Sequence, residues 1–203
     1  YEFLGWYTDP TNGTKIESNT SLISLSSHTL YAHWQSLSGI IYKIRHFKMN
    51  LSGEYPQNPF EEEELNGIGG STISPSVKTY NGFTSPSVQT TTILSNGSRI
   101  VNYYYTRNQY TLSLVSGNGI SNVNGAGTYY YGQNVNISSI PNGGSIFQKW
   151  ESSGSTTTTF SGSINSQTIV MGSENTTLTA SALPSTYSFD YTGNYQTFEA
   201  PFN

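Results

Sequence analysis

Apolar and polar residues alternate along most of the chain, and the alternation has a period of two. A strand points successive side chains to opposite faces of a sheet, so each alternating run predicts a half-buried strand. No window sustains the period of 3.6 that an amphipathic helix requires. The pattern therefore indicates a mainly β protein. The alternating runs are residues 29–34, 40–47, 99–106, 110–115, 134–140 and 176–183.

Turn-forming dipeptides separate the predicted strands. Asn-Gly tolerates the positive φ angles of tight turns and favours hairpins, so we expect residues 117–127 to form a hairpin loop. The best candidate for a short helix is the segment 60–65, FEEEEL, although its four like charges would repel one another on a helix. The Asn-Gly pairs begin at Asn12, Asn66, Asn81, Asn96, Asn118, Asn124 and Asn142.

The predicted strands group into three domains and a tail. We expect residues 1–35, 40–108 and 109–183 to form the domains, with 36–39 as a linker and 184–203 as the start of a further module. The last strand of the second domain passes into the first strand of the third with almost no spacer. Such a junction limits the freedom of the two domains and predicts tandem small domains in an elongated array.

Composition narrows the class of protein. Charged residues make up 10% of the 203 residues, against about 25% in a typical soluble domain. Tyrosine is abundant, at 16 residues. Thr, Tyr, Val and Ile suit a pleated surface, and Asn and Gly suit turns, so the composition agrees with small, thin β domains.

The charge and the missing residue types exclude several functions. The net charge is −4 and the eight Lys and Arg residues form no basic run, so we expect no binding to nucleic acid or to an anionic membrane surface. Without cysteine there is no disulfide and no Cys-based zinc site. The sequence contains no run of about 18 apolar residues, so we expect no membrane insertion. Because the sequence begins within a strand pattern and without a signal peptide, we interpret it as a piece of a longer polypeptide.

Two segments carry the motifs of a known repeat. Residues 3–34 contain a Phe-x-Gly-Trp-Tyr start, an Asn-Gly turn and a Thr-Leu-Tyr-Ala-His-Trp ending. This segment resembles the second half of the internalin B-type repeat, also called the Listeria–Bacteroides repeat, which implies a β-grasp-like fold whose first strand and helix lie upstream. Residues 110–180 resemble a divergent internalin B-type repeat. The marks of the second resemblance are Tyr131, Gly132, Val135, Phe147, Trp150 and the final strand from Met171 to Ala180.

The other segments resemble further modules of bacterial surface proteins. Residues 42–108 look like the mucin-binding-protein-type repeat of Gram-positive surface proteins, mainly on Gly82-Phe83-Thr84 and on the closing strand 97–108. Residues 187–201 resemble the opening of a glycine-rich β module. Together with the internalin B-type segments, these resemblances cover nearly the whole chain. They imply tandem small repeat domains with β-grasp-like or β-sandwich-like folds.

The resemblances imply a non-catalytic protein. They imply an extracellular protein, secreted or anchored to the wall of a Gram-positive bacterium, whose modules form a stalk or an adhesive array with neighbouring repeats. They imply no catalytic, metal-binding or cofactor-binding residue. The partners that they imply are host or wall glycans and proteins. A carbohydrate-binding array attached to an enzyme elsewhere in the chain is the alternative.

Tyrosine side chains are the candidate ligand contacts. In one predicted strand, Tyr103 and Tyr105 share a face and Tyr104 lies on the other. We expect the first two to pack into the core and Tyr104 to face outward. Tyr129 and Tyr130 are further candidates, because an exposed ring beside abundant Asn and Thr suits a sugar. The alternative for all of them is packing in a thin core, with the hydroxyl groups reaching water.

Other prominent side chains are interpreted as structural. We expect Trp6, Trp34 and Trp150 to anchor the cores of their domains. The three histidines, among them His46, lack metal-ligand spacing and are expected at the surface or at strand edges. The four glutamates at 61–64 lack the alternating acids of a calcium loop, so they predict a solvated, charged sheet edge.

A covalent crosslink is a further hypothesis. Gram-positive surface domains can carry Lys–Asn isopeptide bonds that form beside a buried acid. Lys43 lies in an early strand of the predicted second domain and Asn102 in its last strand, which makes them the candidate pair. Each such bond would lower the intact mass by about 17 Da through the loss of ammonia.

Overall fold

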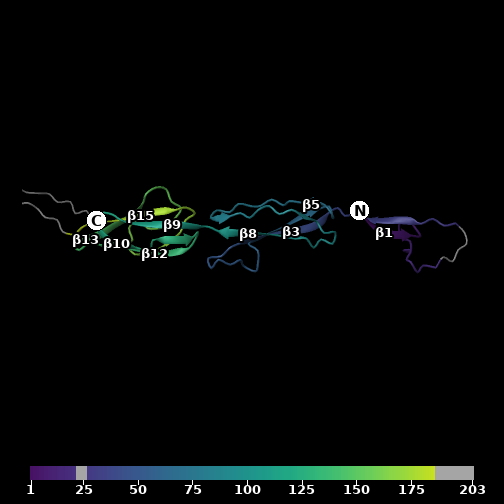
Figure 1. The fold of residues 1–203 in the computed structure, drawn as a ribbon, viewed down its shortest axis with the longest axis horizontal. Helices are drawn as coiled ribbons and strands as arrows, with labels where there is room; N and C mark the ends of the chain where they lie inside the picture. The colour runs from purple at the N-terminus through teal and green to yellow at the C-terminus, as the bar shows by residue number, and fades with distance from the viewer. Residues whose placement is uncertain (22–26, 186–203) are drawn as a thin grey trace, which may run out of the picture. The chain divides into compact units, whose positions relative to one another are not determined.

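The computed structural model describes residues 1–21 and 27–185, and within these ranges every regular element is a strand (Figure 1). The prediction of a mainly β fold is confirmed. The helix candidate at 60–65 is wrong, because β4 (Glu61–Gly67) is a strand. Its glutamates meet cationic side chains, which offsets the repulsion between their like charges.

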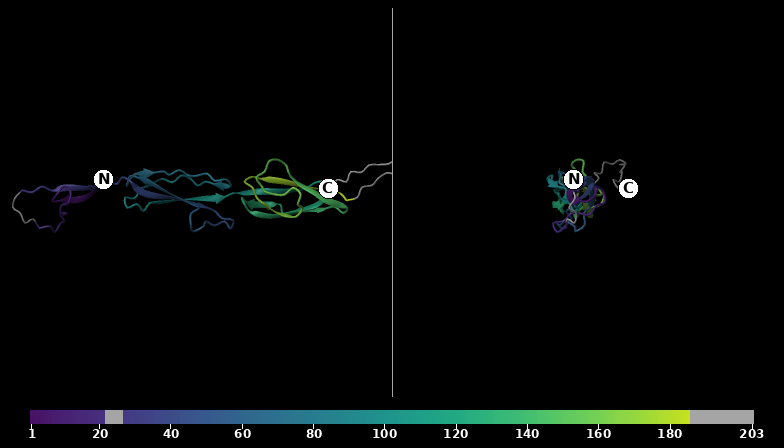
Figure 2. Two further views of the ribbon diagram at one scale, coloured as in Figure 1. Left: turned by 180° about the vertical axis from the view of Figure 1, so that it is seen from behind. Right: turned by 90° about the vertical axis from the view of Figure 1, so that its right-hand side faces the viewer.

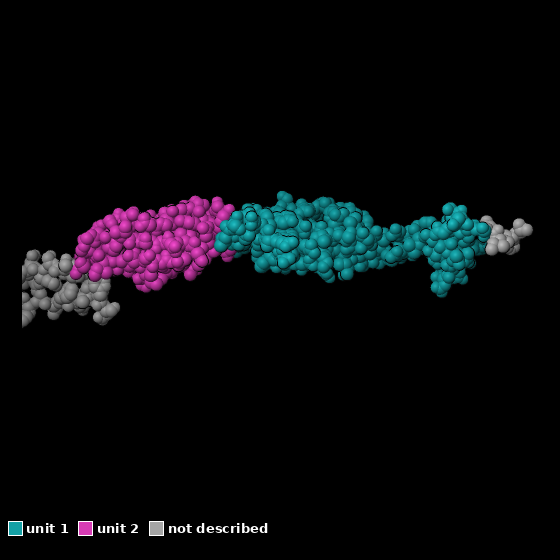
Figure 3. All heavy atoms as spheres, turned by 90° about the horizontal axis from the view of Figure 1, so that it is seen from below, with its two compact units in different colours: residues 1–107 teal, residues 108–203 magenta. Residues whose placement is uncertain are grey.

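The chain divides into two compact units, residues 1–107 and residues 108–203 (Figure 3). Each unit contains its own cluster of buried hydrophobic side chains. The predicted border between the second and third domains lies one residue beyond this division. The predicted further module at 184–203 lies outside the described residues, apart from its first two.

Unit 1 begins with a two-stranded antiparallel sheet of β1 (Glu2–Tyr7) and β2 (Tyr31–Gln35). The prediction that Trp6 and Trp34 anchor a core is wrong, since their side chains are 50% and 57% exposed. Both rings pack on Phe3, with ring centroids 5.7 and 5.0 Å apart. Two strands offer a single layer, and one layer is too thin to bury large rings.

The main sheet of unit 1 has the strand order β4-β3-β8-β6. Its central strands, β3 and β8, run parallel. Alternate residues of β3 and β8 face one side and form the core with Ile93, which confirms that Tyr103 and Tyr105 point inward and Tyr104 outward. The segment 74–90 packs on this inner face through Val77, Tyr80 and Phe83. The remaining strands of the unit are β3 (Ile40–Lys48), β5 (Thr72–Ile73), β6 (Phe83–Thr84), β7 (Thr91–Thr92) and β8 (Ile100–Arg107).

Unit 2 is a β-sandwich of a four-stranded sheet, ordered β11-β9-β15-β13, and a three-stranded sheet, ordered β10-β12-β14 (Figures 1 and 2). Inward-facing residues of both sheets form one core, which contains Trp150 at 2% exposure. The prediction for this tryptophan is therefore confirmed. The strands are β9 (Gln109–Ser116), β10 (Ile120–Asn124), β11 (Gly127–Tyr130), β12 (Asn134–Pro141), β13 (Ser145–Ser152), β14 (Gln167–Val170) and β15 (Thr176–Pro184).

The turn at Asn118-Gly119 connects the two sheets of unit 2. Gly119 has a φ of 72°, and a Cβ atom there would lie 2.6 Å from the carbonyl oxygen of Ala182. The predicted hairpin loop at 117–127 is wrong, because β9 pairs with β11 and β15, whereas β10 pairs with β12. Glycine is needed here for a sharp change of sheet and for a close approach to a neighbouring strand.

Candidate binding surface

Three aromatic side chains gather on the outer face of the main sheet of unit 1. Tyr104 is 44% exposed, and its ring stacks on Phe47 with centroids 4.9 Å apart and an interplanar angle of 20°. Tyr55 meets Tyr104 edge to face at 5.0 Å, and its hydroxyl lies 3.2 Å from the Thr106 hydroxyl. We call Phe47, Tyr55 and Tyr104 the aromatic platform. Its rings are held in place by one another, so it presents a preformed apolar surface.

Charged residues on the same face of the sheet are paired with one another. Lys43 Nζ lies 2.8 Å from carboxylate oxygens of both Glu62 and Glu64, and Arg45 Nε lies 2.6 Å from Glu62. The hydrogen bonds from Lys43 and Arg45 lower the pKa of Glu62, and that with Glu62 raises the pKa of Lys43. The two cations and two anions leave this part of the face without a net charge.

These pairs bear on the hypothesis of a crosslink from Lys43 to Asn102. The Lys43 amine contacts glutamates of β4, which lies on the other side of β3 from the strand that carries Asn102. In register, Asn102 lies opposite Arg45, and its Oδ1 atom is buried without a hydrogen-bond partner. The crosslink stays a prediction, and the ion pairs of Lys43 compete with it.

Intact mass spectrometry of the purified chain tests the crosslink. A bond between Lys43 and Asn102 releases one ammonia molecule, so the mass would be about 17 Da below the value for the sequence. A Lys43→Arg variant cannot form the bond, so its mass should equal the value calculated from its own sequence. A full mass for the unmodified chain would rule the bond out.

The other two candidate tyrosines lie on β11, an edge strand of unit 2. Tyr129 packs against the core, and its hydroxyl donates to the carbonyl oxygen of Gly125 at 2.9 Å. Tyr130 is half-buried. The interpretation of Tyr129 as an exposed ligand contact is not supported, because alternation along β11 turns its ring inward. Of the three candidates, Tyr104 alone is exposed.

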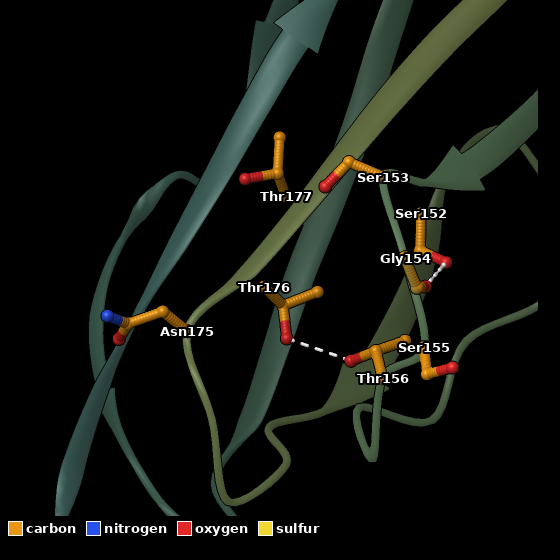
Figure 4. Close-up of a pocket in the computed structure, with 8 residues that line it drawn as sticks. All are labelled: Ser152, Ser153, Gly154, Ser155, Thr156, Asn175, Thr176 and Thr177. Carbon is orange, nitrogen blue, oxygen red and sulfur yellow. Dashed lines mark hydrogen bonds between the residues drawn. The ribbon is translucent and has the colours of Figure 1, made fainter.

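A small hollow in unit 2 is lined by hydroxyl groups and backbone (Figure 4). Its volume of about 60 Å³ has room for only a few water molecules. The hydroxyls of Thr156 and Thr176 lie 2.9 Å apart across it. Because no titratable side chain lines the hollow, it offers no acid or base. The lining residues are Ser152, Ser153, Gly154, Ser155, Thr156, Asn175, Thr176 and Thr177.

His46 contradicts the expectation that the histidines lie at the surface. Its side chain is fully buried, with Nδ1 2.8 Å from the Tyr105 hydroxyl and Nε2 2.9 Å from Glu63. It lies on the central strand β3, in phase with the buried Tyr42 and Ile44. This alternation was visible in the sequence and could have indicated the burial.

Across residues 1–21 and 27–185, no three His, Asp or Glu side chains gather closely enough to hold a metal ion. The described part of the chain has no helix of the length and apolar character that a membrane span requires.

Comparison with protein-family models identifies two parts of the chain. Residues 1–33 match the Listeria-Bacteroides repeat domain, and residues 110–182 match the divergent InlB B-repeat domain. These matches support the resemblances of residues 3–34 and 110–180 to internalin B-type repeats. Repeats of the Listeria-Bacteroides type are typical of bacterial surface proteins. No curated protein and no solved structure matches the sequence.

Proposed function

We propose that this chain is a non-catalytic run of repeat modules from a secreted or wall-anchored protein of a Gram-positive bacterium, where it acts as a stalk or in adhesion. The matches of residues 1–33 and 110–182 to two related repeat models carry this proposal. In this proposal, the segment 40–108 is a further module, of the mucin-binding-protein type. Repeated modules favour binding by avidity, because many weak contacts act together.

Small cores agree with this role. Each unit has its own hydrophobic cluster, and among the described residues of unit 1 this cluster contains six buried hydrophobic side chains. Domains of this size bury a modest share of their surface. A protein built from them gains reach and repetition rather than one deep pocket, and the described hollow in unit 2 is too small for an organic ligand.

Surface location can be tested on the cells that make the protein. Antibodies raised against the purified chain should label intact cells as strongly as permeabilised ones, and brief protease treatment of intact cells should remove the label. A cytoplasmic protein measured in parallel controls for leakage. Labelling that requires permeabilisation would contradict the proposed location.

A second candidate function is the binding of neutral carbohydrate on the aromatic platform, with any enzyme lying elsewhere in the parent chain. The observation that favours it is the exposed ring of Tyr104, supported by Phe47 and Tyr55. Sugar rings present C–H groups to aromatic faces, and tyrosine is enriched at binding surfaces. The paired charges of Lys43 and Glu62 beside it favour an uncharged saccharide over an acidic one.

Binding to mucin O-glycans and to wall polysaccharide can be measured by calorimetry on the full chain. If the platform binds them, Tyr104→Ala should raise the dissociation constant about tenfold through the loss of one stacking surface. Tyr130→Ala, a change of the same size on unit 2, should leave it unchanged. Equal affinity of the Tyr104 variant and the unmodified chain would place binding elsewhere. If no binding is detected at millimolar saccharide, the carbohydrate-binding function is rejected, whereas the proposed role as a stalk or in adhesion is not affected.

A further inference from the structure

The segment 74–90 of unit 1 is held to the main sheet by tyrosine hydroxyl groups, and we call it the strap. The Tyr103 hydroxyl donates to the carbonyl oxygen of Pro75 at 2.7 Å and accepts from the backbone N–H of Gln89 at 3.3 Å. The backbone N–H of Lys78 donates to the Tyr105 hydroxyl at 3.0 Å. The short strand β6 is the one regular element within the strap, so these side-chain contacts supply much of its fastening.

His46 joins the strands on both sides of β3. Glu63 can only accept a hydrogen bond when ionised, so the Nε2 atom beside it is the donor. On the other side, Nδ1 lies 2.8 Å from the Tyr105 hydroxyl, which also accepts from the backbone N–H of Lys78. The ring therefore lies beside both fastenings of the strap.

Carboxylates of β4 make a second fastening. The Lys78 amine pairs with Glu61 and lies 2.7 Å from Glu63, and the Tyr80 hydroxyl donates to Glu61 at 2.8 Å. The hydrogen bonds from Lys78 lower the pKa of both glutamates, and those with the glutamates raise the pKa of Lys78.

A second cation, Lys48, lies at the edge of this cluster. Lys48 Nζ lies 3.4 and 3.7 Å from the ring centroids of Phe60 and Tyr80, and burial lowers its pKa. The titratable groups around His46 are thus Lys48 on its own strand, Glu61 and Glu63 on β4, Tyr103 and Tyr105 on β8, and Lys78 and Tyr80 on the strap.

We propose that acid releases the strap from the sheet, with protonation of Glu61 and Glu63 breaking the contacts. The ionised carboxylates accept from the Lys78 amine and the Tyr80 hydroxyl. Protonation removes the negative charge that strengthens these contacts. Release would expose the aromatic core face of Val101, Tyr103 and Tyr105. This inference does not depend on the proposed surface function.

The direction of the pH effect follows from the glutamates. Glu61 and Glu63 have pKa values below the ordinary 4.5 in the folded chain. Their stabilisation is therefore complete above the ordinary value and is lost as the pH falls through the lower folded values.

Hydrogen exchange of the full chain tests the proposal through protection factors, which correct for the effect of pH on exchange chemistry. Between pH 7.5 and about pH 3, peptides from the strap should lose about tenfold or more of their protection, because Glu61 and Glu63 become protonated only below their ordinary pKa. Peptides from β12 and β15 in unit 2 should keep theirs. Unchanged protection of the strap, or equal loss in both units, would overturn the proposal.

A matched pair of variants locates the effect. Tyr105→Phe removes one hydroxyl from the inner face, so the strap should lose about tenfold of its protection already at pH 7.5. Tyr104→Phe removes a hydroxyl from the outer face and should behave like the unmodified chain. Equal protection of the strap in both variants would contradict the inference that the Tyr105 hydroxyl holds the strap to the sheet.

Discussion

Replacing Tyr103 with alanine should destabilise unit 1 by about 3–5 kcal/mol, the range for removing a large buried ring. The side chain is fully buried between β8 and the strap. Its hydroxyl also joins Pro75 and Gln89, so the variant loses packing and leaves two backbone groups of the strap without their partner. Urea-dependent hydrogen exchange of β3 peptides in the full chain measures this change.

Tyr104→Ala is the control for that measurement, because it removes the same side chain from the neighbouring position. Tyr104 is exposed, and its packing is limited to the platform with Phe47 and Tyr55. The expected cost is about 1 kcal/mol. If Tyr104→Ala were the more damaging change, the assignment of the two faces of β8 would be inverted.

Strand parity is what the sequence predicts most directly, because it is a local property. Tyr103 and Tyr105 point inward and Tyr104 outward, as the alternation in the run indicates. The same reasoning applied to residues 42, 44 and 46 indicates a buried His46. The polar character of histidine predicts exposure, whereas its position in the strand predicts burial. The structure shows a buried side chain, so the expectation of a surface histidine is wrong.

Burial also depends on what covers a strand, and a local pattern does not contain that information. The three tryptophans occupy similar motif positions, yet Trp150 is buried whereas Trp6 and Trp34 are exposed. Trp150 belongs to a sheet that packs on a second sheet, while the other two belong to two strands with one layer. A single sequence does not show this difference.

Side-chain partners far apart in the chain were not predicted. His46 meets Glu63 and Tyr105 across separations of 17 and 59 residues. Tyr55 of the aromatic platform lies 51 residues before its hydroxyl partner Thr106. Such contacts depend on strand order and register, which the sequence pattern leaves open. The edge position of the glutamate run was expected, but its pairing with Lys78 was not.

The second large effect is expected in unit 2, where Trp150→Ala should cost about 3–5 kcal/mol. The ring lies in the core that both sheets share. Its Nε1 donates to the carbonyl oxygen of Asn165 at 2.9 Å, and the Asn165 side chain accepts from the backbone N–H and hydroxyl of Ser139. Asn165 therefore links β13 of one sheet to β12 of the other.

Urea-dependent hydrogen exchange of β12 and β15 peptides measures the loss, and Trp34→Ala is the matched control. The control removes an identical side chain that is largely exposed, so these peptides should keep their stability. In Trp150→Ala, the core loses its largest ring and the link through Asn165 loses one of its two anchors, so β12 and β15 should lose protection together. Loss confined to β13 would mean that Trp150 stabilises only its own strand and that the two sheets are held together without it.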